Sequence, residues 1–264
     1  MRPVVKSVKY FSCGYCTNNL GRVFNGMRGK KRKFPAGAFL LEHTKHGLIL
    51  FDTGYSSSIC KTGLVGRVYN FLNPTSVEEK DELKNQLEKI GIKSKNIKTI
   101  ILSHLHPDHI GGLKSFNESE FIVSEEAMHA YKKAKVRDLI MQRFFPVDFE
   151  DRANIITDEM MTANIIGALK GCDLLNDGSL ILLKLDGHAS GQLGVLINHK
   201  ILLAADSCWG NDLIEASYHM KFPASLIQDD MRNYRSTLDN LKLLEKNGIN
   251  LVFSHGAYDK KELL

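Results

Sequence analysis

A short segment in the middle of the chain carries three histidines and one aspartate within six residues. Residues 103–112 read Ser-His-Leu-His-Pro-Asp-His-Ile-Gly-Gly. Imidazole nitrogens and carboxylate oxygens are ligands that suit zinc and similar divalent ions. His104 and His106 are two residues apart, so on an extended segment both side chains point to the same side and can hold one ion. Asp108 and His109 follow a proline, where the chain turns, and can face a second ion.

Apolar runs predict the elements that must position these residues. Strands are expected at residues 4–11, 38–42, 48–51, 99–102, 121–123, 180–185, 194–197, 201–204 and 251–253. Helices are expected from a capping-box pattern at Ser76 to Ile90, over 124–135 and over 231–246. The apolar stretch 136–170 favours core helix over a segment that covers a cleft. This order indicates two sheets flanked by helices rather than one strictly alternating parallel sheet.

The composition restricts the class of protein. The chain has 264 residues, 43% of them hydrophobic and 25% charged, which is near the average for a globular protein. We therefore predict one large core and a single domain over residues 1–264. No apolar run reaches the roughly 18–20 residues of a membrane span, and Lys6 and Lys9 interrupt the N-terminal stretch. Five cysteines do not form a disulfide framework and favour a reducing cytoplasm.

Four further motifs accompany the histidine-rich segment, and each follows or lies near a predicted strand. They are Asp-Thr-Gly at 52–54, Asp-Gly-His-Ala-Ser-Gly-Gln at 186–192, Ala-Asp-Ser at 205–207 and Ser-His-Gly at 254–256. In this order the five motifs resemble the signature of the metallo-β-lactamase superfamily. The resemblance spans residues 52–255 and implies an α/β fold, a four-layer αββα sandwich with the ligands on loops at one edge of the two sheets.

The resemblance also implies a complete set of ligands for two metal ions. His104, His106 and His188 would bind the first ion, Asp108, His109 and His255 the second, and Asp206 both. Asp52 would accept hydrogen bonds from ligand histidines and orient them. Gln192 stands where many relatives have a second histidine, so its part in orientation or substrate contact is open.

Such a site predicts hydrolysis without an organic cofactor. Two ions about 3.5–4 Å apart can share a hydroxide, because their charge lowers the pKa of bound water toward 7. We expect this metal-bridging hydroxide to cleave a carboxylic ester, a lactone or a thioester, with Asp108 handing a proton to the leaving group. Zinc is the default metal, although iron, manganese and cobalt fit the same nitrogen and oxygen ligands.

Length, spacing and a short C-terminal tail are similar to those of the N-acyl homoserine lactone lactonase-like subgroup. Those enzymes place a tyrosine three residues after the bridging aspartate, where this chain has Trp209. An indole N–H can donate one hydrogen bond but cannot exchange a proton as a phenol does. Apolar side chains that could line a pocket for an acyl chain or aromatic ring, or simply pack in the core, are Phe144, Phe145, Trp209, Tyr218 and Phe222. The expected partner is a small molecule with an apolar moiety.

Two features lie outside this interpretation. Five of the six residues 28–33 are basic, which contributes much of the net charge of +5. Without interleaved aromatic residues the run favours a solvated loop over a nucleic-acid or anionic-membrane contact, yet it motivates the alternative function, a phosphodiesterase or nuclease. Cys13 and Cys16 form a C-x-x-C sequence, which we interpret as incidental or as part of a loop at the mouth of the site. A non-catalytic binding protein is a third alternative. The sequence leaves the oligomeric state open.

Overall fold

The computed structural model describes residues 4–59, 63–134, 138–166, 169–222, 224–258 and 262–264. In these ranges the strands form two sheets. The first sheet has the order β4-β1-β2-β3-β5-β6-β7. Its strands are β1 (Val5–Asn19), β2 (Lys31–His43), β3 (Gly47–Phe51), β4 (Thr75–Ser76), β5 (Ile97–Ile101), β6 (Glu120–Ser124) and β7 (Ala153–Ile156). Pairing is antiparallel from β4 to β3 and parallel from β3 to β7.

The second sheet has the order β13-β12-β11-β10-β9-β8. Its strands are β8 (Ala163–Ile166), β9 (Leu169–Asp173), β10 (Leu180–Lys184), β11 (Leu193–Ile197), β12 (Ile201–Leu203) and β13 (Asn250–Val252). All pairs are antiparallel except β12 with β13. The parallel pair brings the ends of β12 and β13 to the same edge, so the residues that follow them lie close together.

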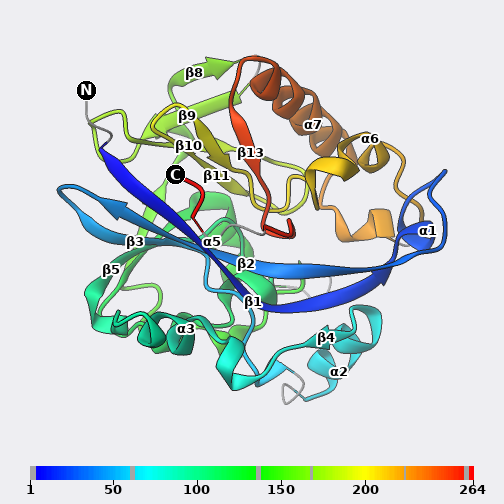
Figure 1. Cartoon of the computed structure of the whole chain (residues 1–264), viewed down its shortest axis with the longest axis horizontal. Coiled ribbons are helices and arrows are strands. Elements are labelled where there is room, and N and C mark those ends of the chain that lie inside the picture. Colours follow the sequence, from blue (N-terminus) through cyan, green and yellow to red (C-terminus); the bar gives the residue numbers. More distant parts are fainter. Residues whose placement is uncertain (1–3, 60–62, 135–137, 167–168, 223, 259–261) are drawn as a thin grey trace.

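Helices cover the outer faces of both sheets (Figure 1). They are α1 (Leu20–Val23), α2 (Gly63–Leu72), α3 (Leu83–Lys89), α4 (Pro107–Ile110), α5 (Glu125–Lys132), α6 (Ile214–Ser217) and α7 (Met231–Lys246). The buried faces of α3 and α5 pack on the first sheet, and the apolar stripe of α7 packs on the second. No helix in the described ranges combines the length and apolar content needed to cross a membrane.

Period-two alternation in the strands creates the four layers. In β2, Phe39 and Leu41 point to the core between the sheets, whereas Leu40 points to the helices outside the first sheet. In β3, Phe51 faces the inter-sheet core and Leu50 the outer one. Because both faces of these strands are covered, they are apolar throughout. The αββα arrangement predicted from the sequence is confirmed.

Two sequence predictions about elements are wrong. The helix expected from Ser76 begins at Leu83, because Thr75 and Ser76 pair with Tyr15 and Cys16 of β1. The described part of 136–170 holds no core helix, but short 3₁₀ turns (Gln142–Phe144 and Asp158–Met160), the strands β7 and β8, and the start of β9. Its β-branched Ile-Ile pairs suit strands, and strand pairing prevails over the apolar content. Residues 136, 137, 167 and 168 of that stretch lie outside the described residues.

Candidate metal centre

The segments that carry the predicted ligands end at one edge of the two sheets. β5 leads into His104 and His106, and α4 follows at once with Asp108 and His109. The second sheet contributes His188 between β10 and β11, Asp206 after β12 and His255 after β13. The structure gathers these seven side chains into two groups, in each of which the ligand atoms lie within 4.8 Å of one another. All seven are buried, with at most 9% of their surface exposed.

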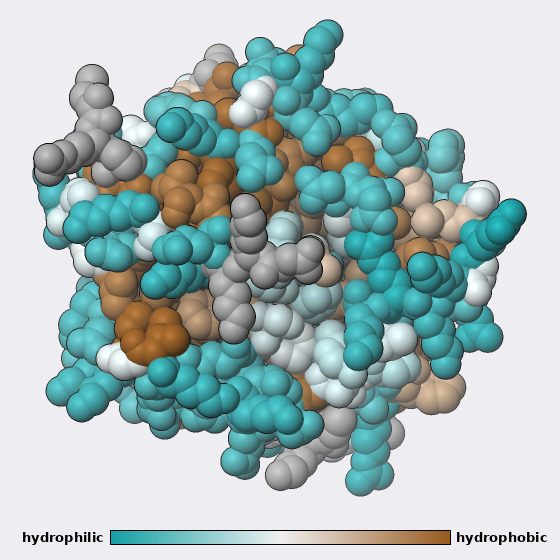
Figure 2. Space-filling model, in the orientation of Figure 1, coloured by the Kyte–Doolittle hydropathy of each residue, from teal (hydrophilic) through white to brown (hydrophobic). Residues whose placement is uncertain are grey.

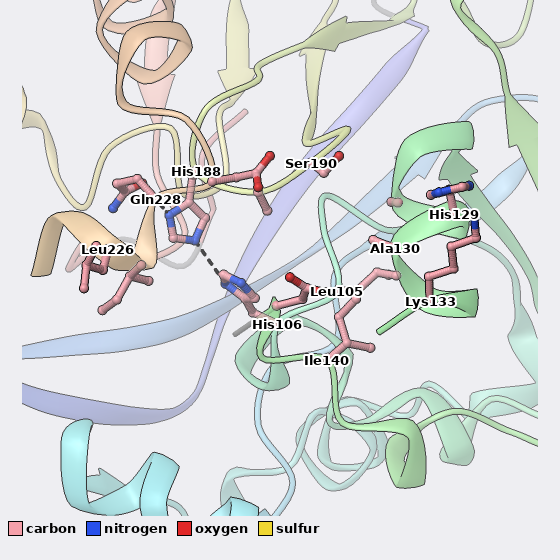
Figure 3. A pocket seen from close by; sticks show the side chains of 15 residues that line it. Leu105, His106, His129, Ala130, Lys133, Ile140, His188, Ser190, Leu226 and Gln228 are labelled. Atoms are coloured by element: carbon pink, nitrogen blue, oxygen red, sulfur yellow. Dashed lines mark hydrogen bonds between the residues drawn. The ribbon is translucent and has the colours of Figure 1, made fainter. Parts of the chain in front are cut away.

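The first group consists of three histidines, His104, His106 and His188. Nδ1 of His106 lies 3.1 Å from Nε2 of His104. It also lies 3.1 Å from Nε2 of His188 (Figure 3). Burial and the neighbouring imidazoles lower the pKa of His104 and His106 well below the usual range. Neutral imidazoles are the form that binds a metal. Nδ1 of His106 can take part in only one in-plane hydrogen bond, so it cannot pair with both His104 and His188. A cation bound by all three nitrogens would satisfy each of them.

The second group contains Asp108, His109, Asp206 and His255. Nε2 of His255 lies 2.8 Å from Oδ2 of Asp206 and 3.5 Å from Oδ2 of Asp108. Nε2 of His109 lies 3.3 Å from Oδ1 of Asp206, yet neither buried atom has a properly aligned hydrogen bond to any residue that the structure describes. Buried polar atoms without partners are rare. A cation between them would satisfy both.

The electrostatics of the second group favour positive charge. Although burial acts against it, Asp52, Asp206 and Asp108 raise the pKa of His109 well above the usual range. Again in opposition to burial, His255 and His109 lower the pKa of Asp206 well below its usual range. Oδ2 of Asp206 also lies 3.6 Å from Nε2 of His188 in the first group. This carboxylate therefore lies between the two groups, where the resemblance places a bridging ligand.

Asp52 holds the segment that carries the first ligands. Its buried carboxylate accepts hydrogen bonds from the backbone N–H of Ser103 (2.8 Å), the Ser103 hydroxyl (2.7 Å) and Nδ1 of His109 (2.7 Å). A proton on Nδ1 leaves the lone pair of His109 on Nε2, which faces the other ligands. The expected orienting contact of Asp52 is present in the structure.

Two further supports were not predicted from the sequence. Nδ1 of His188 lies 2.9 Å from the amide oxygen of Gln228, and Nδ1 of His255 donates to the carbonyl oxygen of Pro35 at 2.7 Å. Both contacts direct Nε2 toward the centre. No motif marks an isolated glutamine or a backbone carbonyl, so the sequence offered no signal for either. Gln192 lies outside both groups and donates to the carbonyl of Leu185 at 3.2 Å.

The expected pocket residues divide into two sets. Trp209 lines a cavity at the metal centre together with Cys16, Phe34 and Tyr69, and its buried Nε1 has no hydrogen-bond partner among the described residues. The expectation is wrong for Phe144 and Phe145, which are only 3% and 4% exposed and pack in the core outside the first sheet.

Two other aromatic residues also lie outside the cavities at the metal centre. Tyr218 packs against the core outside the second sheet and donates to Asp239 at 2.6 Å. Phe222 is 77% exposed. Their directions follow from the tertiary contacts of their segments, which apolar character alone does not reveal.

A larger cavity of about 280 Å³ begins at His106 and His188 (Figure 3). It runs between α5 and the 3₁₀ turn η9 (Ala224–Ile227). Apolar side chains from Leu105, Ile140 and Leu226 line it, and the polar side chains of α5 lie at its far end. An elongated group could therefore extend from the metal centre into this space.

The two cysteines of the C-x-x-C sequence lie in different places. Cys16 lines the cavity at the metal centre, whereas Cys13 is buried beneath Gly54. Burial raises the pKa of the Cys16 thiol to about 12 and that of Cys13 further. Both thiols are free and protonated at neutral pH, which argues against a redox pair.

A third group of ligand-type residues, His43, His46 and Asp177, lies where β2 turns into β3. Nδ1 of His43 accepts hydrogen bonds from the backbone N–H groups of Lys45 and His46, both at 3.1 Å. The remaining proton must therefore be on Nε2, which lies 3.0 Å from the Ser179 hydroxyl and 3.3 Å from Oδ2 of Asp177. A nitrogen that carries a proton cannot bind a metal, so this group is a structural tie between the two sheets.

The basic run is not the solvated loop that we expected. Lys31–Lys33 begin β2 and pair with Thr17–Asn19 of β1. Within the run, Arg32 forms an ion pair with Asp212 at 2.6 Å, and Nζ of Lys33 lies 4.3 Å from the ring centre of Tyr15. Arg28 and Lys30 remain exposed in the connection before the strand.

An αββα sandwich with buried histidine and aspartate groups at one edge defines a metal-dependent hydrolase. The chain belongs to the metallo-β-lactamase superfamily, and the sequence pattern of that family matches residues 33–254. An N-acyl homoserine lactonase of Agrobacterium fabrum is 24% identical over 240 residues, which cover 84% of this chain and 79% of the relative.

Solved structures of lactonases share the fold of this chain. An N-acyl homoserine lactone hydrolase with N-hexanoyl-L-homoserine bound at its catalytic metal centre gives a TM-score of 0.74 at 22% identity, and the match covers 96% of this chain and 94% of the other. A dizinc quorum-quenching lactonase gives 0.68 at 15% identity, with 99% and 93% covered.

Proposed function

We propose that this metallo-hydrolase holds two divalent ions, zinc by default, and cleaves a lactone, carboxylic ester or thioester. The observation that carries the proposal is the pair of buried ligand groups with Asp206 between them. The first ion would be held by His104, His106 and His188, the second by Asp108, His109 and His255, and both by Asp206. The dizinc centre named for one structural relative supports two ions of this kind.

When bound, such ions activate water at neutral pH and polarise the carbonyl of the substrate. The residues of the chain would supply position and protons. Asp108 lines the cavity at the metal centre, where its carboxylate could accept a proton from the attacking water and pass it to the leaving oxygen or sulfur. Trp209 lines the same cavity, and its unpaired N–H can donate a hydrogen bond to the substrate carbonyl oxygen. Asp52 would fix the orientation of His109.

The larger cavity supports a substrate with an apolar arm. Its volume of about 280 Å³ and its lining by Leu105, Ile140 and Leu226 suit an acyl chain bound beside the metal centre. Of the three proposed substrate classes, the similarity to an N-acyl homoserine lactonase favours a lactone. A single domain over residues 1–264 and a cytoplasmic location stay predictions.

A hydrolysis panel tests the proposal. Protein purified without chelator should contain about two metals per chain, and it should hydrolyse acyl lactones, thioesters or aryl esters far faster than bis-p-nitrophenyl phosphate. Asp108→Asn should reduce that activity by at least about 100-fold, whereas the matched control Asp148→Asn, in an exposed turn, should not. Metal-free protein, or equal activity of the Asp108 variant, would refute the proposal. Phosphodiester hydrolysis as the dominant activity would favour the nuclease alternative.

A further inference from the structure

The basic run lies beside the entrance to the metal centre and has no assigned role. Cys16 and Asn18 of β1 and Phe34 of β2 line the cavity there, and the exposed connection between β1 and β2 lies next to them. The exposed cations of this connection and of the adjoining strand end are Arg22, Arg28, Lys30, Lys31 and Lys33. Within the described part of the chain, none of these five forms an ion pair with a carboxylate; Arg32 alone in the run does.

Large apolar side chains are exposed around the same entrance. Phe222, which precedes η9, is 77% exposed, and Leu226, within η9, is 68% exposed. Phe71 is 83% and Leu72 is 59% exposed at the end of α2. Isolated exposed apolar residues are ordinary. Four of them around one cavity, next to five cations, need a physical reason.

Backbone hydrogen bonds place both apolar segments against the basic connection. The N–H of Lys221 donates to the carbonyl of Val23 at 2.8 Å, and the N–H of Asn25 donates to that of His219 at 2.9 Å. Residues 219–222 therefore lie along the connection. Ile227, just beyond them, lines the cavity at the metal centre.

The end of α2 is tied to β1 in the same way. The N–H of Thr17 donates to the carbonyl of Pro74 at 2.9 Å, and Nδ2 of Asn18 donates to Oδ1 of Asn73 at 3.2 Å. Asn73 and Tyr69 line the same cavity as Ile227. In Figure 1, α1 and α2 accordingly lie on the same side of the molecule, and Figure 2 shows hydrophilic residues over that edge with hydrophobic ones beside them.

We infer that this rim docks on the surface of an anionic phospholipid bilayer. The rim comprises Arg22, Arg28, Lys30, Lys31, Lys33, Phe71, Leu72, Phe222 and Leu226. Clustered cations are attracted to anionic headgroups, and exposed Phe and Leu side chains can enter the boundary between headgroups and acyl chains. Nucleic acid would satisfy the cations but would leave the aliphatic side chains in water. A bilayer satisfies both sets.

Docking in this manner would turn the entrance of the metal centre toward the lipid surface. The cavity lined by Cys16 and Phe34 is also lined by Tyr69 of α2 and Ile227 of η9, so it adjoins both apolar segments of the rim. An amphipathic substrate that partitions into the bilayer would then reach the ligands without crossing bulk water. The inference concerns binding, so a vesicle assay tests it independently of hydrolytic activity.

Cosedimentation with sucrose-loaded vesicles tests the charge component. The full chain should bind vesicles that contain phosphatidylglycerol in phosphatidylcholine, bind pure phosphatidylcholine weakly, and dissociate at high salt. Each cation near an anionic surface changes partitioning roughly fivefold. Lys30→Glu with Lys31→Glu should therefore weaken binding by about 25-fold or more. The matched control, Lys84→Glu with Lys89→Glu on α3, makes the same change in net charge away from the rim and should bind within about threefold of the native protein.

A second pair of variants tests the apolar component. Phe71→Ser with Phe222→Ser should weaken vesicle binding at least about tenfold, whereas Val147→Ser, also fully exposed, should not change it. Absence of vesicle binding overturns the inference. So does binding to duplex DNA as tight as to vesicles and unaffected by the Phe substitutions, which would indicate general polyanion affinity. A dimer in size-exclusion chromatography that the Phe substitutions dissociate would assign the rim to a second copy of the chain and also overturns it.

Discussion

Replacing Asp52 by asparagine should selectively weaken the second metal position. Asp52 has a φ of +60°, and asparagine tolerates this left-handed conformation, so the backbone should not be strained. The N–H of Ser103 can still donate to the amide oxygen in place of Oδ1. The amide NH₂ group would then occupy the position of Oδ2, which now accepts from Nδ1 of His109 at 2.7 Å. Two donors would face each other there.

His109 can relieve this conflict by moving its proton from Nδ1 to Nε2. The protonated Nε2 would then point at the atoms of the second group, 3.3 Å from Oδ1 of Asp206, and could not bind a metal. Loss of an orienting contact to a ligand histidine reduces metal affinity by about 10- to 100-fold, or about 1.4–2.7 kcal/mol. Because a ligand nitrogen is lost and not merely reoriented, we expect about 100-fold for the second position. The three-histidine position should change little.

Stepwise competition with a chromophoric chelator measures the two affinities separately. Long-range ¹⁵N–¹H spectra of the histidine rings report the tautomer of His109. Asp177→Asn is the matched control, because Asp177 faces Nε2 of His43 outside the metal centre. Unchanged affinity at the second position would refute the reasoning. An equal loss at both positions with an unchanged His109 tautomer would also refute it.

Three further predictions concern the loop that carries His188, the pH dependence of stability and the cavity at the metal centre. Gly187→Ala should destabilise the protein by more than about 3 kcal/mol and release metal, because Gly187 has a φ of +123° and its added Cβ would lie 2.1 Å from the backbone N of Tyr234. The control Gly47→Ala has open space around it and should cost about 1 kcal/mol in chemical denaturation. Burial lowers the pKa of His43, so the unfolded state binds the proton first and stability falls as the pH drops below about 6.5; His43→Asn should flatten that decline in Tm between pH 7.5 and 5.5, and an unchanged slope would contradict the assignment. Trp209→Phe keeps the ring but removes its unpaired N–H, so kcat/KM for the best ester-type substrate should fall about tenfold, with no loss if the indole does not contact substrate.

The local part of the metal centre could be predicted from the sequence because its ligands are close in the chain. His104, His106, Asp108 and His109 fall within one turn that leaves a strand, and strand and turn geometry already restrict their directions. The ligands from the second sheet are different. His188 contacts His106 in space although the two are 82 residues apart in the sequence. Only the resemblance to a known family assigned them to the same metal position. Physical reasoning on spacing cannot supply such a contact.

The wrong predictions share a physical cause. Phe144 and Phe145 satisfy every criterion of a pocket residue except direction. Both are buried in the outer core, where the Phe145 ring packs against Tyr131 and Phe149. The predicted helix start at Ser76 is wrong because β1 offers the backbone of that segment an alternative set of hydrogen bonds, as the edge strand β4. Tertiary partners decided both outcomes, and neither partner is visible in a local pattern.

The metal centre connects the two sheets through the backbone as well as through its ligands. The N–H of Leu193, in the second sheet, donates to the carbonyl of Ser103 at 2.8 Å, next to the first ligands. The N–H of Gly37, in the first sheet, donates to the carbonyl of Ser254 at 3.0 Å, next to His255. These two ligand segments are therefore fixed to the opposite sheet by bonds that do not involve a metal. Because the relative position of the sheets sets the distances between ligands, the packing of the inter-sheet core helps to determine the geometry of both ion positions.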